Sequence, residues 1–324
     1  MRTALLSLAV VSLCLVAAPA VAQQTPLEAK EKSVIRFEVN VDKIINSELG
    51  KQLDLKDKIQ NLPGINPEEI DFSAISRVFG SLSLPDNVAA FRSLGPGSDL
   101  PMDILTRIEY SDAGALSSIF TKMSETTEEV EIDGKKFIKP SDASAPQGLL
   151  THRVDEKTME TATKKYIMRA DREVGTDGLS KAWGMAPDHA IRIVVDVDGM
   201  ADLKEDLIDS VGESGVALDY VKLLNNISNI RLTIDLDGDD LLTLSATGKD
   251  ENLAEEFADG LDSIFFTAKF GLNPANAPNP EAGEIMQDIS DALEAKVDGK
   301  EVNVVIPRPA GLGDFLLGIM GPGF

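Results

Sequence analysis

Four aspartates lie within six residues around Gly238, namely Asp235, Asp237, Asp239 and Asp240. Calcium favours such clusters of carboxylate oxygens. The spacing does not match a helix–loop–helix calcium loop, because the glycine comes too early and no glutamate closes the loop at its twelfth position. A polar strand face followed by a tight Asp-Gly turn accounts for the same residues. We therefore predict a hairpin turn here, with no metal ligand and no cofactor-binding residue.

The chain has two histidines, His152 and His189, and Asp188 directly precedes the second. A histidine and an aspartate can serve a serine hydrolase, but such a triad is defined by its geometry. The chain contains none of the short patterns G-x-S-x-G, H-E-x-x-H, G-x-x-x-x-G-K-S/T or G-x-G-x-x-G. We predict no catalytic residue, and expect His152 within a strand and His189 at the start of one. A hydrolase that uses His189 with Asp188, or scattered carboxylates, is the competing class.

Further acidic residues stand where strands give way to helices. Asp196, Asp198 and Asp202 lie at the end of one apolar strand, and the equivalent positions at the end of another include Asn40 and Asp42. The first turn of a helix leaves N–H groups unpaired, and the helix dipole favours an anion there. These residues are therefore predicted to cap helices.

Two strands with the same pattern precede these caps, at 34–41 and 190–197. In the first, apolar and polar residues alternate with the period of two that indicates a half-buried strand. The apolar members are Ile35, Phe37, Val39 and Val41, and the polar members are Arg36, Glu38, Asn40 and Asp42.

Further segments recur in the same order after each of these strands. The strand expected from Ile75 matches that from Ile227, and Ile104-Leu105-Thr106 matches Leu241-Leu242-Thr243. Helices expected after Asp112 and Asp250 follow, and then the hairpins Ile132-Asp133-Gly134-Lys135 and Val297-Asp298-Gly299-Lys300. The shared order predicts an α+β protein of two similar units, each β-α-β-β-α-β with a ferredoxin-like tendency. Each unit should have an antiparallel-rich sheet backed by helices.

The remaining segments set the predicted boundaries. Strands are expected at 148–154 and 158–163, and helices at 164–172 and 178–184, where Trp183 would pack between the units. We predict a signal peptide at 1–22, a leader at 23–33, units at 34–187 and 188–307, and a tail at 308–324. The segment 272–280 is expected to be a flexible break. The apolar tail is expected to dock as a short amphipathic helix.

The start of the chain predicts export. A short basic beginning with Arg2, an apolar run from Ala4 to Val16 and a final Ala20-Val21-Ala22 are typical of a secretory signal peptide. We expect cleavage between Ala22 and Gln23, and a secreted or periplasmic product. Cys14, the single cysteine, lies inside this signal. Lipid attachment there is the alternative, although Leu13 is bulky for such a site. The mature chain would then contain no cysteine and no disulfide.

The charge of the chain bounds its partners. The sequence carries 31 basic and 54 acidic residues, for a net charge of −23. Loss of residues 1–22 removes Arg2 alone and leaves 30 basic residues and a net charge of −24. Nucleic acid and anionic membrane surfaces should repel such a chain. The partner would then be a protein or a small molecule.

Four features of the sequence carry a resemblance to known proteins. They are the export signal, the strand followed by an aspartate, the hairpin from Ile132 to Phe137, and the segment Val154-Asp155-Glu156-Lys157-Thr158 that leads to Trp183. In these features the chain resembles secreted proteins of planctomycete-type bacteria. The resemblance implies an exported bacterial protein and carries over no functional residue. We predict a non-catalytic binding or structural protein. A hydrolase with an unusual site, and a carrier of apolar ligands between sheet and helices, are the alternatives.

Overall fold

The computed structural model describes residues 33–60, 74–85, 87–92, 100, 102–132, 134–139, 148–167, 175–211, 221–277 and 279–320. The predicted signal peptide, its cleavage site at Ala22 and Gln23, and Cys14 lie outside these residues. The chain divides into two compact units. The first comprises residues up to 36 together with 59–176, and the second comprises 37–58 and 177–324. This division differs from the predicted boundary at 187, because 37–58 and 177–187 group with the second unit.

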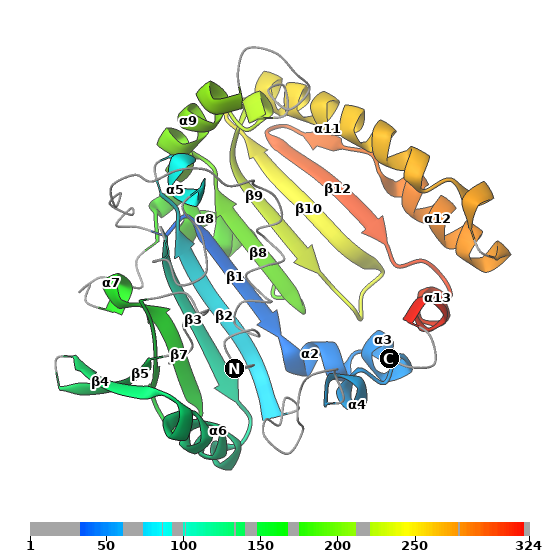
Figure 1. Ribbon diagram of the computed structural model, residues 1–324. Coiled ribbons are helices and arrows are strands. Elements are labelled where there is room, and N and C mark those ends of the chain that lie inside the picture. The colour runs from blue at the N-terminus through cyan, green and yellow to red at the C-terminus, as the bar shows by residue number, and fades with distance from the viewer. Residues whose placement is uncertain are drawn as a thin grey trace. The chain divides into compact units, whose positions relative to one another are not determined.

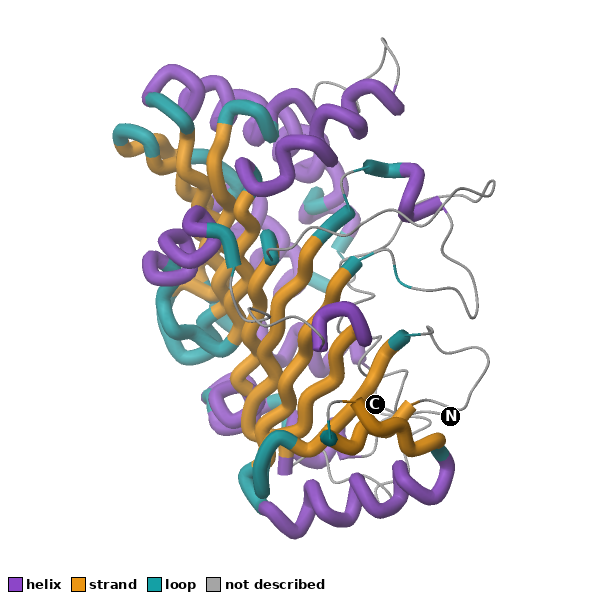
Figure 2. Tube along the Cα trace, turned by 90° about the vertical axis from the view of Figure 1, so that its left-hand side faces the viewer, coloured by secondary structure: helices purple, strands orange, loops and turns teal. Residues whose placement is uncertain are grey.

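The first unit is built on an antiparallel sheet with the strand order β2-β3-β7-β6-β5-β4 (Figure 1). Helix α6 lies at the lower end of these strands (Figure 1 and Figure 2). The strands are β2 (Ile75–Ser83), β3 (Asp103–Tyr110), β4 (Glu128–Ile132), β5 (Lys135–Lys139), β6 (Leu149–Arg153) and β7 (Thr158–Thr163). The helices are α5 (Ala89–Arg92), α6 (Ala113–Thr126) and α7 (Lys164–Ile167).

Local sequence explains much of this unit. The carboxylate of Asp112 accepts a hydrogen bond from the N–H of Gly114 and caps α6, as predicted. Leu116 and Ile119 lie one turn apart on the buried face of that helix. Gly134 takes a positive φ of 75° in the β4–β5 turn, a conformation that costs a glycine little.

The second unit has the strand order β1-β8-β9-β10-β12-β11, and each pair from β8 to β11 is antiparallel. Its strands are β1 (Ile35–Asn40), β8 (Ile191–Asp196), β9 (Ile227–Ile234), β10 (Asp240–Gly248), β11 (Lys296–Asp298) and β12 (Glu301–Pro307). Its helices are α2 (Val41–Asn46), α3 (Glu48–Gln52), α4 (Leu55–Gln60), α8 (Asp177–Met185), α9 (Ala201–Val211), α11 (Glu251–Gly271), α12 (Pro280–Ala292) and α13 (Leu312–Met320), with short 3-10 helices η2 (Asp198–Met200) and η3 (Pro274–Asn276).

Helices cover both faces of this second sheet. Successive residues of a strand point to opposite faces, and Val194 and Val195 of β8 illustrate this. Val194 packs against Leu179 and Ala182 of α8, whereas Val195 packs against the cluster that contains Phe257 of α11. The mixed helix-and-strand class and the antiparallel, helix-backed sheets are therefore confirmed.

Two finer expectations differ from the structure. A split β-α-β arrangement would leave room for another strand between β8 and β9, yet these two are direct antiparallel neighbours. The N–H of Val197, just after β8, donates to the carbonyl of Ser228, near the start of β9. The chain therefore leaves β8 and enters β9 at the same end of the sheet. The two predicted Asp-Gly hairpins, which equivalent units would place at equivalent positions, pair with different strands of their sheets. β12 pairs with β10, but β5 pairs with β6 and not with β3. The duplication of the units stays a prediction.

Several elements were predicted incorrectly in detail. Asn40 and Asp42 were predicted to cap a helix. Asn40 does cap α2, Asp42 lies in its first turn, and α2 is followed by two more short helices, the first of them capped by Ser47. Helix α12 was not predicted, because the Asn- and Pro-rich stretch before it was interpreted as a flexible break. Asn279 caps α12 and Pro280 occupies its first turn, and both are ordinary helix-start residues. The tail helix is present as α13, and Leu312 packs with Leu49 and Ile285.

Candidate functional site

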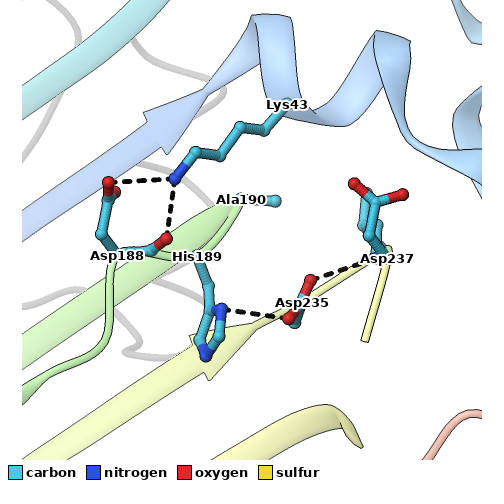
Figure 3. A pocket seen from close by; sticks show the side chains of 7 residues that line it. Lys43, Asp188, His189, Ala190, Asp235 and Asp237 are labelled. Carbon is cyan, nitrogen blue, oxygen red and sulfur yellow. Dashed lines mark hydrogen bonds and ion pairs between the residues drawn. The ribbon is translucent and has the colours of Figure 1, made fainter. Parts of the chain in front are cut away.

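Charged side chains from three parts of the second unit meet around a pocket of about 230 Å³ (Figure 3). Helix α2, the segment that enters β8, and the turn after β9 each contribute to it. The lining residues are Lys43, Asp188, His189, Ala190, Asp235, Leu236 and Asp237.

Helix α2 places Lys43 over the segment that enters β8. The N–H of Asn40 donates to the carbonyl of Ala190 at 2.8 Å, which joins the end of β1 to the start of β8. The side chain of Asn40 then accepts from the N–H of Lys43 and caps α2. From this position the Nζ atom of Lys43 lies 3.0 Å from Oδ2 of Asp188 and donates to the Asp188 carbonyl at 2.7 Å.

On the opposite wall, His189 faces Asp235. The Nδ1 atom of His189 lies 3.2 Å from Oδ2 of Asp235, and Oδ1 of Asp235 accepts from the N–H of Asp237 at 3.0 Å. Burial by itself raises the pKa of Asp235. Hydrogen bonds from the N–H groups of Asp237 and Gly238, and the nearby charges of His189 and Lys43, outweigh burial and hold this pKa below its ordinary value.

Asp237 extends the same set of bonds to helix α3. Its Oδ1 accepts from the N–H of Glu48, the first residue of α3, at 2.9 Å. The carboxylate of Glu48 lies 3.3 Å from Nη1 of Arg308, and this same Nη1 atom donates to the carbonyl of Leu236 at 3.2 Å. The Arg308 N–H donates to the Asp239 carbonyl at 2.7 Å. The turn after β9 is therefore bonded to α3 and to the residue that follows β12.

Gly238 is required in this turn by space and not by its backbone angles. A Cβ atom built on Gly238 would lie 2.6 Å from Oδ2 of Asp235 and 3.1 Å from its Cγ. Gly238 is absent from the residues with positive φ, so the turn does not use the left-handed conformation that Asp-Gly turns often adopt. The predicted hairpin between β9 and β10 is confirmed, and its glycine makes room for the carboxylate that faces His189.

Asp188 and His189, which the sequence suggested as a catalytic pair, do not pair with each other in the structure. Asp188 and His189 line the same pocket, but Asp188 pairs with Lys43 and His189 pairs with Asp235. A histidine held by an aspartate is the orienting half of a hydrolytic triad. The lining residues include no serine, threonine or cysteine that could act as the nucleophile.

The other histidine is part of a buried polar group in the first unit. His152 on β6 lies opposite Glu160 on β7, which in turn lies opposite Arg107 on β3. Nδ1 of His152 is 3.8 Å from Glu160, and Nε of Arg107 donates to Glu160 at 2.8 Å. The ring of Phe137 lies 4.7 Å from the imidazole. Glu160 has no exposed surface, so these side chains are positioned to balance a charge inside the sheet.

Of the aspartates predicted to cap helices, Asp196 accepts from the N–H of Gly199 at the start of η2, and Asp198 pairs with Lys249 at 3.2 Å. Within the residues that the structure describes, no three or more His, Cys, Asp or Glu side chains are grouped so that they could hold a metal ion. Sequence reasoning missed Lys43, Glu48 and Arg308. They lie far along the chain from the residues they contact, and nothing in their local sequence marks them.

Comparison with known proteins does not identify a function for this pocket. No protein-family model and no curated protein matches the chain. Solved structures of TP0453 align over most of both chains. Crystal form I has 10% identity, a TM-score of 0.40, and coverage of 91% of this chain and 97% of that one. Crystal form III has 11% identity, the same TM-score, and coverage of 91% and 99%. Likeness at this level supports no inference about function. Across the described part of the chain, no helix combines the length and apolar character that crossing a membrane requires.

Proposed function

We propose that the chain is an exported, non-catalytic binding or structural protein, and that the charged residues around the pocket hold α2 and α3 against the sheet. The observation behind this proposal is the way in which these charges pair. Lys43 binds Asp188, His189 faces Asp235, and the carboxylate of Asp237 accepts from the start of α3. Each of these contacts joins segments that are distant in sequence.

The energetics favour such a role. An isolated exposed ion pair contributes roughly 0–1 kcal/mol, but neighbouring pairs that share partners can fix the geometry of a loop. Here one turn receives bonds from α3 and from Arg308, while its Asp235 holds His189. A ligand that entered the pocket would have to compete with these internal partners.

A hydrolase is the second candidate, and the His189–Asp235 pair is the observation that favours it. The two classes are distinguished by profiling residues 23–324 on ester, peptide and glycoside substrates, with His189→Ala as the test variant. Asp209→Asn, an exposed change on α9, serves as the control. We expect no activity that depends on His189, and a lower stability of His189→Ala. Hydrolysis that disappears in folded His189→Ala, and persists in the control, would assign catalysis to the pocket.

Export is part of the same proposal, together with the resemblance to secreted planctomycete-type proteins. It is supported by the signal pattern that ends at Ala22. Intact-mass analysis of the protein from a bacterial host that exports it should give a chain that begins at Gln23. A chain that begins at Cys14 with added lipid, or that retains residues 1–22, would contradict the proposed cleavage. Lipid that co-purifies in native mass spectrometry would favour a carrier of apolar ligands.

A further inference from the structure

Helix α11 carries two aromatic side chains that its own unit does not bury. Phe266 is 66% exposed and Phe270 is 68% exposed. Their ring centroids lie 5.2 Å apart, with the planes nearly perpendicular at 86°. One exposed apolar residue is ordinary, but two that stand in contact form a patch that water solvates poorly.

The helix period places this pair on the outer side of α11. The buried residues of the helix are Ala254, Phe257 and Ala258, which pack with residues of the sheet. At about 100° per residue, positions 266 and 270 lie on the side of the helix that points away from these three. Among the described residues, neither phenylalanine belongs to the core cluster that packs α11 against the sheet.

The same outer side is acidic about two to three turns earlier. Glu255 and Asp259 are exposed and four residues apart, and Phe266 follows Asp259 by seven residues. All three fall on one stripe of the helix, with Phe270 one turn further on. At a rise of about 1.5 Å per residue, the acidic and aromatic parts of the stripe are about 10 Å apart. We call Glu255, Asp259, Phe266 and Phe270 the outer stripe.

We propose that the outer stripe is a docking surface for a protein partner that presents an apolar groove flanked by lysine or arginine side chains. The phenylalanines would fill the groove, as aromatic anchors do at the centre of protein interfaces. The carboxylates would meet the basic side chains beside it and would orient the encounter. This surface is distinct from the pocket and does not depend on the role proposed for the pocket.

The charge of the chain is the argument for this partner over the others. A second copy of the mature chain would bring another net charge of −24, and the acidic residues beside the aromatic pair would add to the repulsion. An anionic membrane would be repelled in the same way. A basic groove satisfies both halves of the stripe at once.

The test uses a synthetic helical peptide of leucine and lysine, whose apolar ridge is flanked by lysine, as a fluorescent probe of the mature protein. We expect saturable binding in fluorescence anisotropy, and weakening by about tenfold or more in Phe266→Ser/Phe270→Ser, because anchor residues carry most of the energy of an interface. Glu255→Gln/Asp259→Asn should weaken binding and reduce its dependence on salt. Glu205→Gln/Asp209→Asn, exposed residues four apart on α9, makes the same change of charge elsewhere and should leave binding unchanged.

Four results would overturn the proposal. The first is a failure of the peptide to bind. The second is equal binding by the parent and by Phe266→Ser/Phe270→Ser, which would show attraction by net charge alone. The third is a dimer in sedimentation analysis that the phenylalanine changes dissociate, because the stripe would then bind a second copy. The fourth is co-sedimentation with phosphatidylcholine vesicles that those changes abolish, because the stripe would then bind a lipid surface. Circular dichroism of each variant confirms that the helix is retained.

Discussion

Arg192 lies between a buried carboxylate and an indole ring. Its guanidinium forms an ion pair with Glu38, whose side chain is 2% exposed, and its Cζ atom lies 3.9 Å from the ring centroid of Trp183. These three residues come from β8, β1 and α8 of the second unit. A planar guanidinium can bind a carboxylate along its edge and stack an aromatic ring on its face. Through Arg192 of β8, this arrangement links β1 to α8.

The first prediction follows from this pair. Glu38→Gln should lower the free energy of unfolding by about 3–5 kcal/mol, because it leaves a largely buried arginine without its counter-charge. Urea unfolding followed by the fluorescence of Trp183, the single tryptophan, measures the change. Glu129→Gln is the matched control, because Glu129 and its partner Lys136 are 57% and 77% exposed, and its effect should stay below about 1 kcal/mol. Equal effects of the two changes would contradict the structural role of the buried pair.

The second prediction concerns Gly238. Gly238→Ala should lower the free energy of unfolding by about 1–3 kcal/mol, because its Cβ would overlap the Asp235 carboxylate and push it from His189. Gly184→Ala is the control: Gly184 lies within α8, and a Cβ there would meet nothing within 4 Å. That change should raise stability by about 0.5–1 kcal/mol, the helix preference of alanine over glycine. Thermal or urea unfolding that ranked the two variants in the reverse order would show that the turn has room to spare.

The third prediction is a pH dependence that originates at Asp235. Its pKa lies below the ordinary value of 3.8, so the folded protein binds this proton less tightly than the unfolded chain. Ionised Asp235 therefore contributes stability at pH values above 3.8, and the contribution is lost as pH falls through the lower folded pKa. Asp235→Asn should be less stable than the parent near about pH 7, and the difference should vanish in strong acid. Urea unfolding across this range measures it, and a difference that did not change with pH would contradict the assignment.

Alternation and capping in the sequence predicted most strands and several helix starts, because these depend on neighbouring residues. Asp250 caps α11 and Asp112 caps α6, both as expected. The same reasoning placed Glu38 on the solvent side of β1, where the structure buries it. Alternation identifies the two faces of a strand but cannot reveal which segments, distant in sequence, cover the polar face. Partners such as Arg192, distant in sequence, decide whether a polar side chain is buried.

The contacts of the candidate site were even harder to predict from local sequence patterns. The sequence marked Asp188, His189 and the aspartates of the turn, and all of these but Asp239 and Asp240 line the pocket. It gave no indication that Lys43 would take Asp188 as its partner, or that His189 would face Asp235. The His189–Asp235 pairing depends on the antiparallel alignment of β8 with β9, which the expected split arrangement would not have produced. The Lys43–Asp188 pairing depends on the bond that joins the end of β1 to the start of β8.

The last prediction concerns calcium. Two carboxylates of the turn after β9, those of Asp235 and Asp237, are directed to different protein partners. That of Asp235 faces His189 and the N–H of Asp237, and that of Asp237 accepts from Glu48. Calcium requires six to eight oxygens converging on one point. We therefore expect no saturable micromolar binding of calcium in titration calorimetry, and no difference between the parent and Asp237→Asn/Asp239→Asn. A micromolar site in the parent that this double variant abolishes would show that the turn rearranges around the ion, and that the protein binds calcium specifically.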